Sequence, residues 1–264
     1  MSSLTLALTD STTMLRRNLK HMQRYPSLTV MLIGQPIVIL LLFVYVFGAT
    51  MGAGIAGASA GRSEYLAFIT PGILAITVAS VALGTAISVA MDMTEGIIAR
   101  FRTMAIARVS VLTGHVVGAM IQTAIALVVV TGVAVLLGFR TTDASPRDWL
   151  AAVAMLAAFA FALTWLTVAM GLVSKSVETA SNIPMFLILL PFLGSGFVPA
   201  DSLPTAMGWF ADYQPFTPVI ETLRGLLLGT PIGNNAVLAL GWSAAIALTG
   251  YVWAKVLYNR DPSR

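Results

Sequence analysis

The sequence predicts an all-α polytopic membrane protein with six transmembrane helices. Hydrophobic residues make up 58% of the 264-residue chain and its mean hydropathy is +0.88, which is too apolar for a soluble domain of this length. The apolar residues form continuous runs rich in Leu, Ala, Val and Gly, and this pattern favours helices over the alternating strands of a membrane barrel. Because a bilayer core is about 30 Å thick, each helical span needs roughly 20 such residues.

Six apolar stretches meet or approach this length. They divide the chain into a cytoplasmic N-terminal segment (1–27), a transmembrane domain (28–258) and a short cytoplasmic tail (259–264). The predicted spans cover residues 28–48, 66–90, 111–138, 149–173, 183–200 and 235–256.

The positive charges predict how these spans are oriented. Lys and Arg are enriched in the cytoplasmic loops of membrane proteins. With both termini in the cytoplasm, the inner segments hold eleven Lys and Arg residues, and the outer segments hold four, namely Arg62, Arg140, Arg147 and Arg224. We therefore expect both termini inside, and we attribute the net charge of +4 to membrane topology rather than to nucleic-acid binding.

The segment before the first span contains MLRRNLKHMQRYP. Leu15, Leu19 and Met22 recur at helical spacing, which predicts a helix in the cytoplasmic interface with its basic side chains at anionic lipid headgroups. The alternative is an ordinary basic flank that only orients the first span. The basic residues concerned are Arg16, Arg17, Lys20 and Arg24.

The stretch MDMTEGIIARFRTMAIAR (91–108) concentrates charge between the second and third spans. A short helix over 94–104 fits this stretch, because Glu95 near its start and Arg100 and Arg102 near its end complement the helix dipole. A short charged helix with one aromatic residue is suited to docking in a groove on a soluble partner. The alternative is a solvated loop whose arginines only enforce the topology.

The stretch 183–233 departs from the pattern of simple spans. Three prolines interrupt its first part, which is short for a span. The following part, 201–230, is too polar to cross lipid and predicts two short re-entrant helices packed on protein in the outer leaflet. An amphipathic hairpin resting on the outer surface is the alternative. Glu221 and Arg224 are spaced at i and i+3, so they are placed to form an ion pair.

The sequence lacks the residues that several classes of function require. The interiors of the predicted spans contain no Asp, Glu, Lys or Arg, which argues against a proton-driven transporter. His115 near the inner end of the third span is interpreted as a hydrogen-bonded interfacial imidazole. The sequence has no G-x-x-x-x-G-K-[ST] phosphate-binding loop, no Cys and only two His, so neither ATP hydrolysis, a metal site nor a catalytic residue is predicted in this chain. It is expected to be a transport subunit, not an enzyme, with its energy supplied from elsewhere.

Four motifs together resemble the ABC-2 type transporter permeases, and within that family the daunorubicin/doxorubicin-resistance type. They are D-x-x-x-G-x-x-x-R-F-R from Asp92 to Arg102, YLAFITPGI at 65–73, GFVPADSLP at 196–204 and QPFTPVIETLRGLLLG at 214–229. They cover most of the chain in the expected order. The resemblance implies the six-span type V exporter fold and a place in a bacterial plasma (inner) membrane.

The resemblance also implies partners and site residues. The permease is expected to form a homo- or heterodimer with a second permease subunit and to pair with two copies of a separate ABC ATPase subunit, which binds Mg-ATP. No cofactor is expected in this chain itself. The first cytoplasmic loop is expected to be the coupling helix, and its residues are Asp92, Glu95, Gly96, Arg100, Phe101 and Arg102. The expected outer gate consists of Phe197, Pro199, Gln214, Pro215, Glu221 and Arg224.

The expected cargo is a drug-like or lipophilic small molecule, or a lipid, that leaves the cell past the outer gate. Met and aromatic side chains adapt to varied apolar ligands, although each of them also has an ordinary packing role, and a glutamine at depth also serves to bond a neighbouring helix. The residues assigned to the substrate path are Met31, Gln35, Phe43, Phe186 and Phe192. Two alternatives stay open: an exporter of polysaccharide or lipid-linked glycan on the same scaffold, and a non-transporting assembly or anchoring subunit.

Overall fold

The computed structural model of the protein describes residues 12–13, 15–17, 20, 26–56, 61–96, 108–141, 144–199, 202 and 204–259. Within these ranges every regular element is helical. The elements are α2 (Pro26–Leu42), the π-helical turn η1 (Phe43–Phe47), α3 (Gly48–Ala56), α4 (Arg62–Thr94), α6 (Arg108–Leu136), α7 (Pro146–Val173), α8 (Val177–Asn182), α9 (Met185–Leu189), the 3₁₀ turn η2 (Leu190–Leu193), α10 (Thr205–Tyr213), α11 (Phe216–Leu228) and α12 (Asn235–Asn259).

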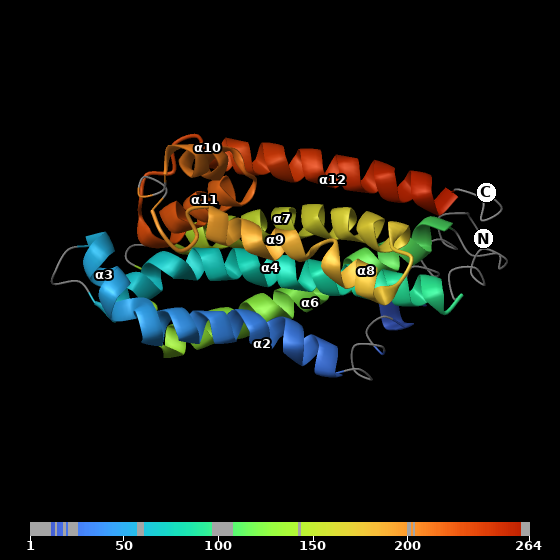
Figure 1. Ribbon diagram of the computed structural model, residues 1–264, viewed down its shortest axis with the longest axis horizontal. Coiled ribbons are helices and arrows are strands. Elements are labelled where there is room, and N and C mark those ends of the chain that lie inside the picture. Colours follow the sequence, from blue (N-terminus) through green and yellow to red (C-terminus); the bar gives the residue numbers. More distant parts are fainter. Residues whose placement is uncertain are drawn as a thin grey trace.

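The long helices lie side by side in an elongated bundle (Figure 1). One end carries Thr94, the last residue of α4, and Asn259, the last residue of α12. The opposite end carries α10, α11 and Arg62, the first residue of α4. Following the predicted orientation, we name these the inner end and the outer end.

Five helical segments are long and apolar enough to cross a membrane, which fits a multi-pass membrane protein. They confirm the positions of all predicted spans except the fifth. The central helix α4 extends beyond the predicted 66–90 because Glu64 and Asp92 lie within its end turns, where polar side chains still reach water or partners. The five segments are Pro26–Gly54, Arg62–Thr94, Val111–Leu136, Pro146–Val173 and Asn235–Asn259.

The fifth predicted span, 183–200, is not one helix. The prolines at 184 and 191 interrupt it, and the chain forms the short pieces α9 and η2 there, directly after the short helix α8. All three pieces pack against α4, and Figure 1 shows them following its length from the inner toward the outer end. This interrupted segment therefore connects the inner end of α7 to the elements at the outer end.

α4 is the central helix of the bundle and most of its surface is buried. It packs against α2, α6, α7 and α11 as well as the broken segment. At Gly72, an added Cβ atom would lie 2.6 Å from the backbone oxygen of Gly196. A glycine is needed there because the turn after η2 approaches the backbone of α4 directly.

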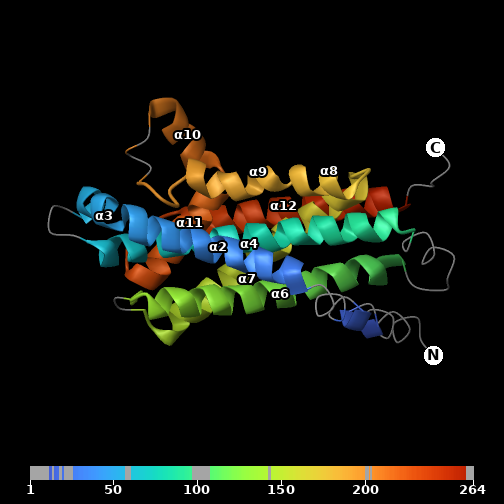
Figure 2. The same cartoon turned by 60° about the horizontal axis from the view of Figure 1, so that its bottom comes forward.

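α10 and α11 form the predicted pair of short helices at the outer end, but they are packed differently. α11 belongs to the hydrophobic core, and its first residue, Phe216, lies edge-to-face on Phe159 of α7 at a ring-centroid distance of 4.8 Å. α10 exposes Trp209 and Tyr213, and Figure 2 shows it standing away from the bundle. α11 is thus held inside the protein, whereas α10 lies on its outside.

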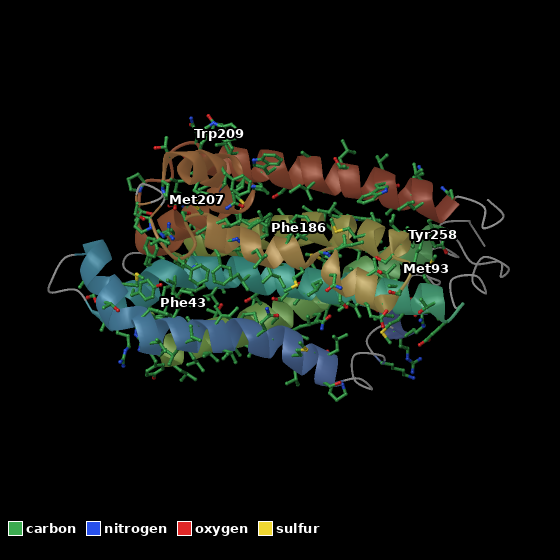
Figure 3. All side chains as sticks on the ribbon, in the orientation of Figure 1. Phe43, Met93, Phe186, Met207, Trp209 and Tyr258 are labelled. Carbon is green, nitrogen blue, oxygen red and sulfur yellow. The ribbon has the colours of Figure 1, made fainter. Side chains whose placement is uncertain are left out.

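A smaller apolar cluster closes the inner end. Trp165 of α7 packs there with Val89 of α4 and Tyr258 of α12. Figure 3 shows Tyr258 and Met93 together at this end. The inner ends of α4, α7 and α12 are therefore joined by packing.

Candidate coupling site at the inner end of the bundle

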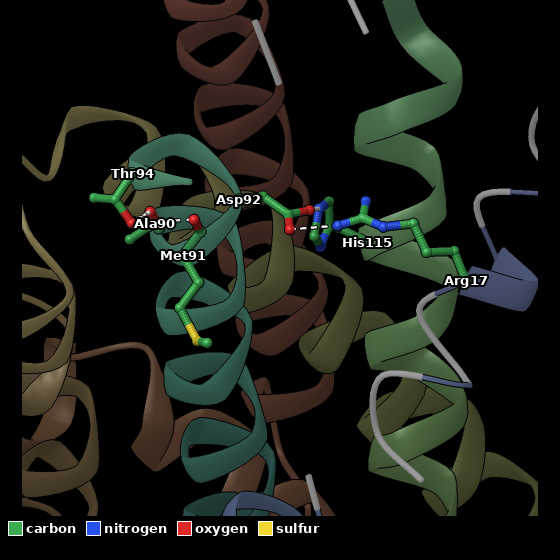
Figure 4. Close-up of polar contacts among 6 residues, drawn as sticks. All are labelled: Arg17, Ala90, Met91, Asp92, Thr94 and His115. Carbon is green, nitrogen blue, oxygen red and sulfur yellow. Dashed lines mark hydrogen bonds and ion pairs between the residues drawn. The ribbon is translucent and has the colours of Figure 1, made fainter. Parts of the chain in front are cut away.

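α4 ends in a hydrogen-bonded turn directly before the predicted coupling helix. The hydroxyl of Thr94 donates to the backbone oxygens of Ala90 and Met91, each at 3.0 Å, as Figure 4 shows. The N–H of Glu95 donates to Met91 O at 2.9 Å. Gly96 then adopts a φ of +69°, a left-handed conformation that ends helices and that glycine takes without steric cost.

The predicted helix over 94–104 therefore differs at its start. Thr94 belongs to α4, and Glu95 lies in the turn that closes α4. Its negative charge is exposed at the C-terminal end of a helix dipole, and not at the N-terminal end as predicted. The remaining predicted coupling residues lie outside the described residues, so their role stays a prediction; they are Arg100, Phe101 and Arg102.

Asp92 is the centre of a polar cluster on the last turns of α4. Its side chain is buried, with Oδ2 lying 3.1 Å from Nε2 of His115 on α6. Its Oδ1 accepts a hydrogen bond from Nη2 of Arg17 in the N-terminal segment. Figure 4 shows Arg17 and His115 both directed at this carboxylate. The sequence correctly predicted that His115 is hydrogen-bonded, but it placed Asp92 among residues that face a partner.

The burial of Asp92 makes its partners necessary. A carboxylate that leaves water loses its hydration, and only charged or hydrogen-bonding partners compensate for that loss. Arg17 supplies a charge-assisted bond and His115 a second contact on the other oxygen. Charge pairing and hydrogen bonding to both oxygens of Asp92 are therefore the interactions that this cluster shows.

The N-terminal segment is helical where it is described, at residues 12–13, 15–17 and 20. Arg16 and Lys20 are exposed, and their contact with lipid headgroups stays a prediction. Arg17 differs, because it turns to Asp92 instead. The fourth basic residue of the predicted interfacial helix, Arg24, lies outside the described residues.

At the outer end, the predicted pair of Glu221 and Arg224 is present, but Arg224 is buried and only 5% exposed. Its Nη2 donates to Ser195 O at 2.7 Å and to Phe68 O at 3.2 Å. The guanidinium therefore ties α11 to α4 and to the turn after η2. The spacing of the pair predicted the contact with Glu221 but not the two distant backbone partners.

Gln214 is a second buried tie at the outer end. Its Nε2 donates to Leu190 O at 3.1 Å and to the Thr217 hydroxyl at 3.0 Å, which fixes the start of α11 against η2. The other predicted gate residues lie in the same connection. Phe197 is buried, and Pro199 and Pro215 are half-buried.

The predicted substrate-path residues are only partly brought together. Phe192 stacks on the gate residue Phe197 at a centroid distance of 4.3 Å, and Phe43 lies 4.6 Å from Phe197. Figure 3 shows Phe186 farther from the outer end than Phe43. Among the predicted path residues, Met31 and Phe186 are exposed, and Gln35 is half-buried.

Sequence reasoning missed an apolar groove between α6 and α7, with a volume of about 350 Å³. Leu74 of α4 and Leu227 of α11 belong to its lining, together with Trp149 near the outer end. The available signal was a series of alanines on α7, since Ala152, Ala157 and Ala160 also line it. An alanine leaves space where the neighbouring helix does not move closer to fill it.

Comparisons with known proteins agree with this architecture. The family model for the ABC-2 type transporter matches residues 9–228, from the N-terminal segment to the end of α11. The chain is 28% identical over 225 residues to the daunorubicin resistance ABC transporter permease protein DrrB1 of Streptomyces coeruleorubidus, covering 85% of this chain and 77% of that protein. It is 27% identical over 209 residues to the probable doxorubicin resistance ABC transporter permease protein DrrC of Mycobacterium tuberculosis, covering 76% and 75%. The chain belongs to the ABC-2 type transporter family, whose members are membrane permease subunits of ABC transporters.

Proposed function

We propose that this chain is the permease subunit of an ATP-driven exporter in a bacterial plasma membrane. A separate ABC ATPase subunit binds and hydrolyses Mg-ATP, and this chain supplies the path through the bilayer. Relatives named for daunorubicin and doxorubicin resistance support a lipophilic, drug-like cargo. The proposed assembly has two permease subunits, identical or different, and two ATPase subunits.

The position of the segment 95–107 supports its assignment as the contact with the ATPase subunit. The segment 95–107 connects α4, the central helix, with α6 at the inner end, and its sequence holds Glu95, Arg100 and Arg102. Force applied there acts directly on the helix that contacts most of the bundle. A charged segment that directly follows a well-packed helix is suited to recognise a subunit of complementary charge.

The course of the chain supports six crossings with both termini in the cytoplasm. α7 ends at the inner end and α12 begins at the outer end. The broken segment Val177–Leu193 runs between these ends along α4, so it makes the fifth crossing. Its interrupted backbone is tolerated at membrane depth because it packs on protein rather than on lipid.

The outer closure consists of α11 and the turn after η2. Arg224 and Gln214 tie these elements together through buried hydrogen bonds. α11 also contacts Phe159, a residue near the middle of α7, which supports a re-entrant position in the outer leaflet. Opening the exit then means separating α11 from α4 or from η2.

The lining of the groove between α6 and α7 favours a lipophilic cargo over a glycan. The groove between α6 and α7 is lined almost entirely by aliphatic side chains, and its volume of about 350 Å³ lies at the lower end of the range for ligand pockets. Sugars need dense hydrogen-bonding partners, and only two threonines and one tryptophan in this lining offer any. The alternative is an exporter of glycan or lipid-linked glycan, and the test must distinguish it from an exporter of lipophilic small molecules.

The test is ATP-dependent uptake into inside-out membrane vesicles that contain this chain and its ATPase subunit. Tagged permease should retain the ATPase subunit during purification, and the vesicles should accumulate doxorubicin with ATP but not without it. Glu95→Ala and Arg100→Ala should abolish uptake while leaving membrane insertion intact. A purified chain that moves doxorubicin with no nucleotide-hydrolysing subunit would overturn the assignment. Accumulation of a lipid-linked oligosaccharide without doxorubicin would favour the alternative cargo.

A further inference from the structure

The Asp92 cluster joins three parts of the chain that are distant in sequence. Asp92 lies on α4 and His115 on α6, the two helices that flank the segment 95–107. Arg17 belongs to the N-terminal segment, 75 residues before Asp92. The carboxylate of Asp92 therefore links α4 to α6 and to the N-terminal segment, which precedes the first long helix, α2.

We propose that Asp92 is a mechanical junction that passes a displacement of the coupling segment to α6 and to the N-terminal segment. Arg17 and His115 are the positioning residues of this junction. The proposal rests on the proposed function, because it takes 95–107 as the contact with the ATPase subunit. It adds a route by which the N-terminal segment receives the movement.

The stiffness of the last turn of α4 makes this route direct. Asp92 precedes Thr94, the last residue of α4, and the Thr94 hydroxyl and the Glu95 N–H brace that turn from within. A displacement of the segment after Gly96 thus moves the backbone of Asp92 with it. The turn transmits motion instead of absorbing it.

Because the carboxylate of Asp92 is buried, a displacement of Asp92 also displaces Arg17 and His115. Asp92 is 5% exposed and His115 6% exposed, so neither can replace its partner with bulk water at low cost. The two partners use different oxygens of Asp92, so they hold it at the same time and do not compete. The junction therefore moves as a unit.

Arg17 is the residue at which to test the junction, because its side chain is 35% exposed and its removal does not open the core. The chain contains no Cys, so a spin-label pair can be added without other changes. Lys20→Cys reports on the N-terminal segment, and Lys255→Cys on the inner end of α12; both positions are exposed. The complex with the ATPase subunit is placed in lipid nanodiscs, and the distance between labels is measured with and without Mg-ATP trapped by vanadate.

In the labelled parent, Mg-ATP should shift the distance between the labels. Arg17→Ala should remove most of that shift, and Arg17→Lys should restore it in part because the charge returns without the guanidinium fork. Lys175→Ala, which removes an exposed inner-end charge outside the cluster, is the matched control and should leave the shift unchanged.

Three results would overturn the junction: no shift in the labelled parent, an undiminished shift in Arg17→Ala, or an equal loss in Lys175→Ala. Loss of the ATPase subunit from Arg17→Ala but not from the parent would also overturn it, since Arg17 would then be a docking residue. Failure of the parent itself to retain an ATPase subunit is a different outcome, because it contradicts the proposed function.

Discussion

The guanidinium of Arg224 lies over the ring of Phe68, with its carbon 4.0 Å from the ring centroid. The same arginine pairs with Glu221 and donates to two backbone oxygens. A single side chain of α11 thus combines a charge pair, hydrogen bonds and a cation–π contact with α4.

Arg224→Leu should destabilise the protein strongly, because it leaves Glu221 without its partner and two buried oxygens without a donor. Glu221 keeps part of its contact with water, because its side chain is 27% exposed, so the expected loss is that of unsatisfied buried hydrogen-bonding groups, about 1–3 kcal/mol each. Unfolding by SDS titration in mixed micelles measures the loss. Arg147→Leu is the control, because Arg147 is an exposed arginine at the same end, and its unfolding midpoint should stay close to that of the parent.

Gly250→Ala should force α12 away from α7. The added Cβ would lie 2.5 Å from Leu166 N and 2.7 Å from Trp165 C, both backbone atoms that cannot turn aside. Overpacking of this kind costs about 1–3 kcal/mol, and the same SDS titration measures it.

Gly241 on the same helix provides the matched comparison. No atom lies within 4 Å of the Cβ position there, so Gly241→Ala should be neutral or stabilising by up to about 1 kcal/mol through helix propensity. Equal effects of the two substitutions would contradict the close approach of α12 to α7.

Gly96→Ala should impair coupling, because a φ of +69° costs an L-residue about 1–2 kcal/mol and the chain relieves this strain by leaving α4 in another direction. The ratio of cargo moved to ATP hydrolysed, measured in vesicles, should fall. Gly96→Asn should retain more coupling, since asparagine tolerates the left-handed region better than alanine. An unchanged ratio in Gly96→Ala would mean that the exit direction does not matter.

Ala157→Trp should weaken uptake of a lipophilic cargo by filling the groove between α6 and α7. Displacing apolar contact equivalent to about two methylene groups lowers the apparent affinity about tenfold, so the concentration of cargo at half-maximal uptake should rise. Ala151→Trp is the control on the same helix, because Ala151 is exposed and does not line the groove. If both variants take up cargo like the parent, the groove is not part of the path.

The sequence predicted the long helices well, because each depends on a local property, the length of an apolar run. It also predicted the contact between Glu221 and Arg224, which follows from helical spacing alone. The fifth span shows the limit of that reasoning. Its apolar composition predicted a crossing and its prolines predicted irregularity, but the division into α8, α9 and η2 depends on how the pieces pack against α4.

The predictions for single charged residues were weaker, because they depend on residues far away in the chain. Asp92 belongs by sequence to a dense charge cluster, and such clusters are normally solvated. Its burial follows from His115, 23 residues later, and from Arg17 in another segment. Arg224 was likewise predicted as one member of a pair, and its contact with Phe68 O spans 156 residues. No local pattern encodes these contacts.

Phe68 and Asp92 belong to the same continuous helix, α4, and a rise of about 1.5 Å per residue separates them by about 36 Å. One of them meets Arg224 near the outer face, and the other meets Arg17 and His115 near the inner face. Pro71 removes one backbone donor near the outer end of α4, but the burial of most of the helix among its neighbours couples its two ends. A molecule that immobilises the exposed surface of the outer end would therefore also restrain Asp92 and the turn that follows it at the opposite end.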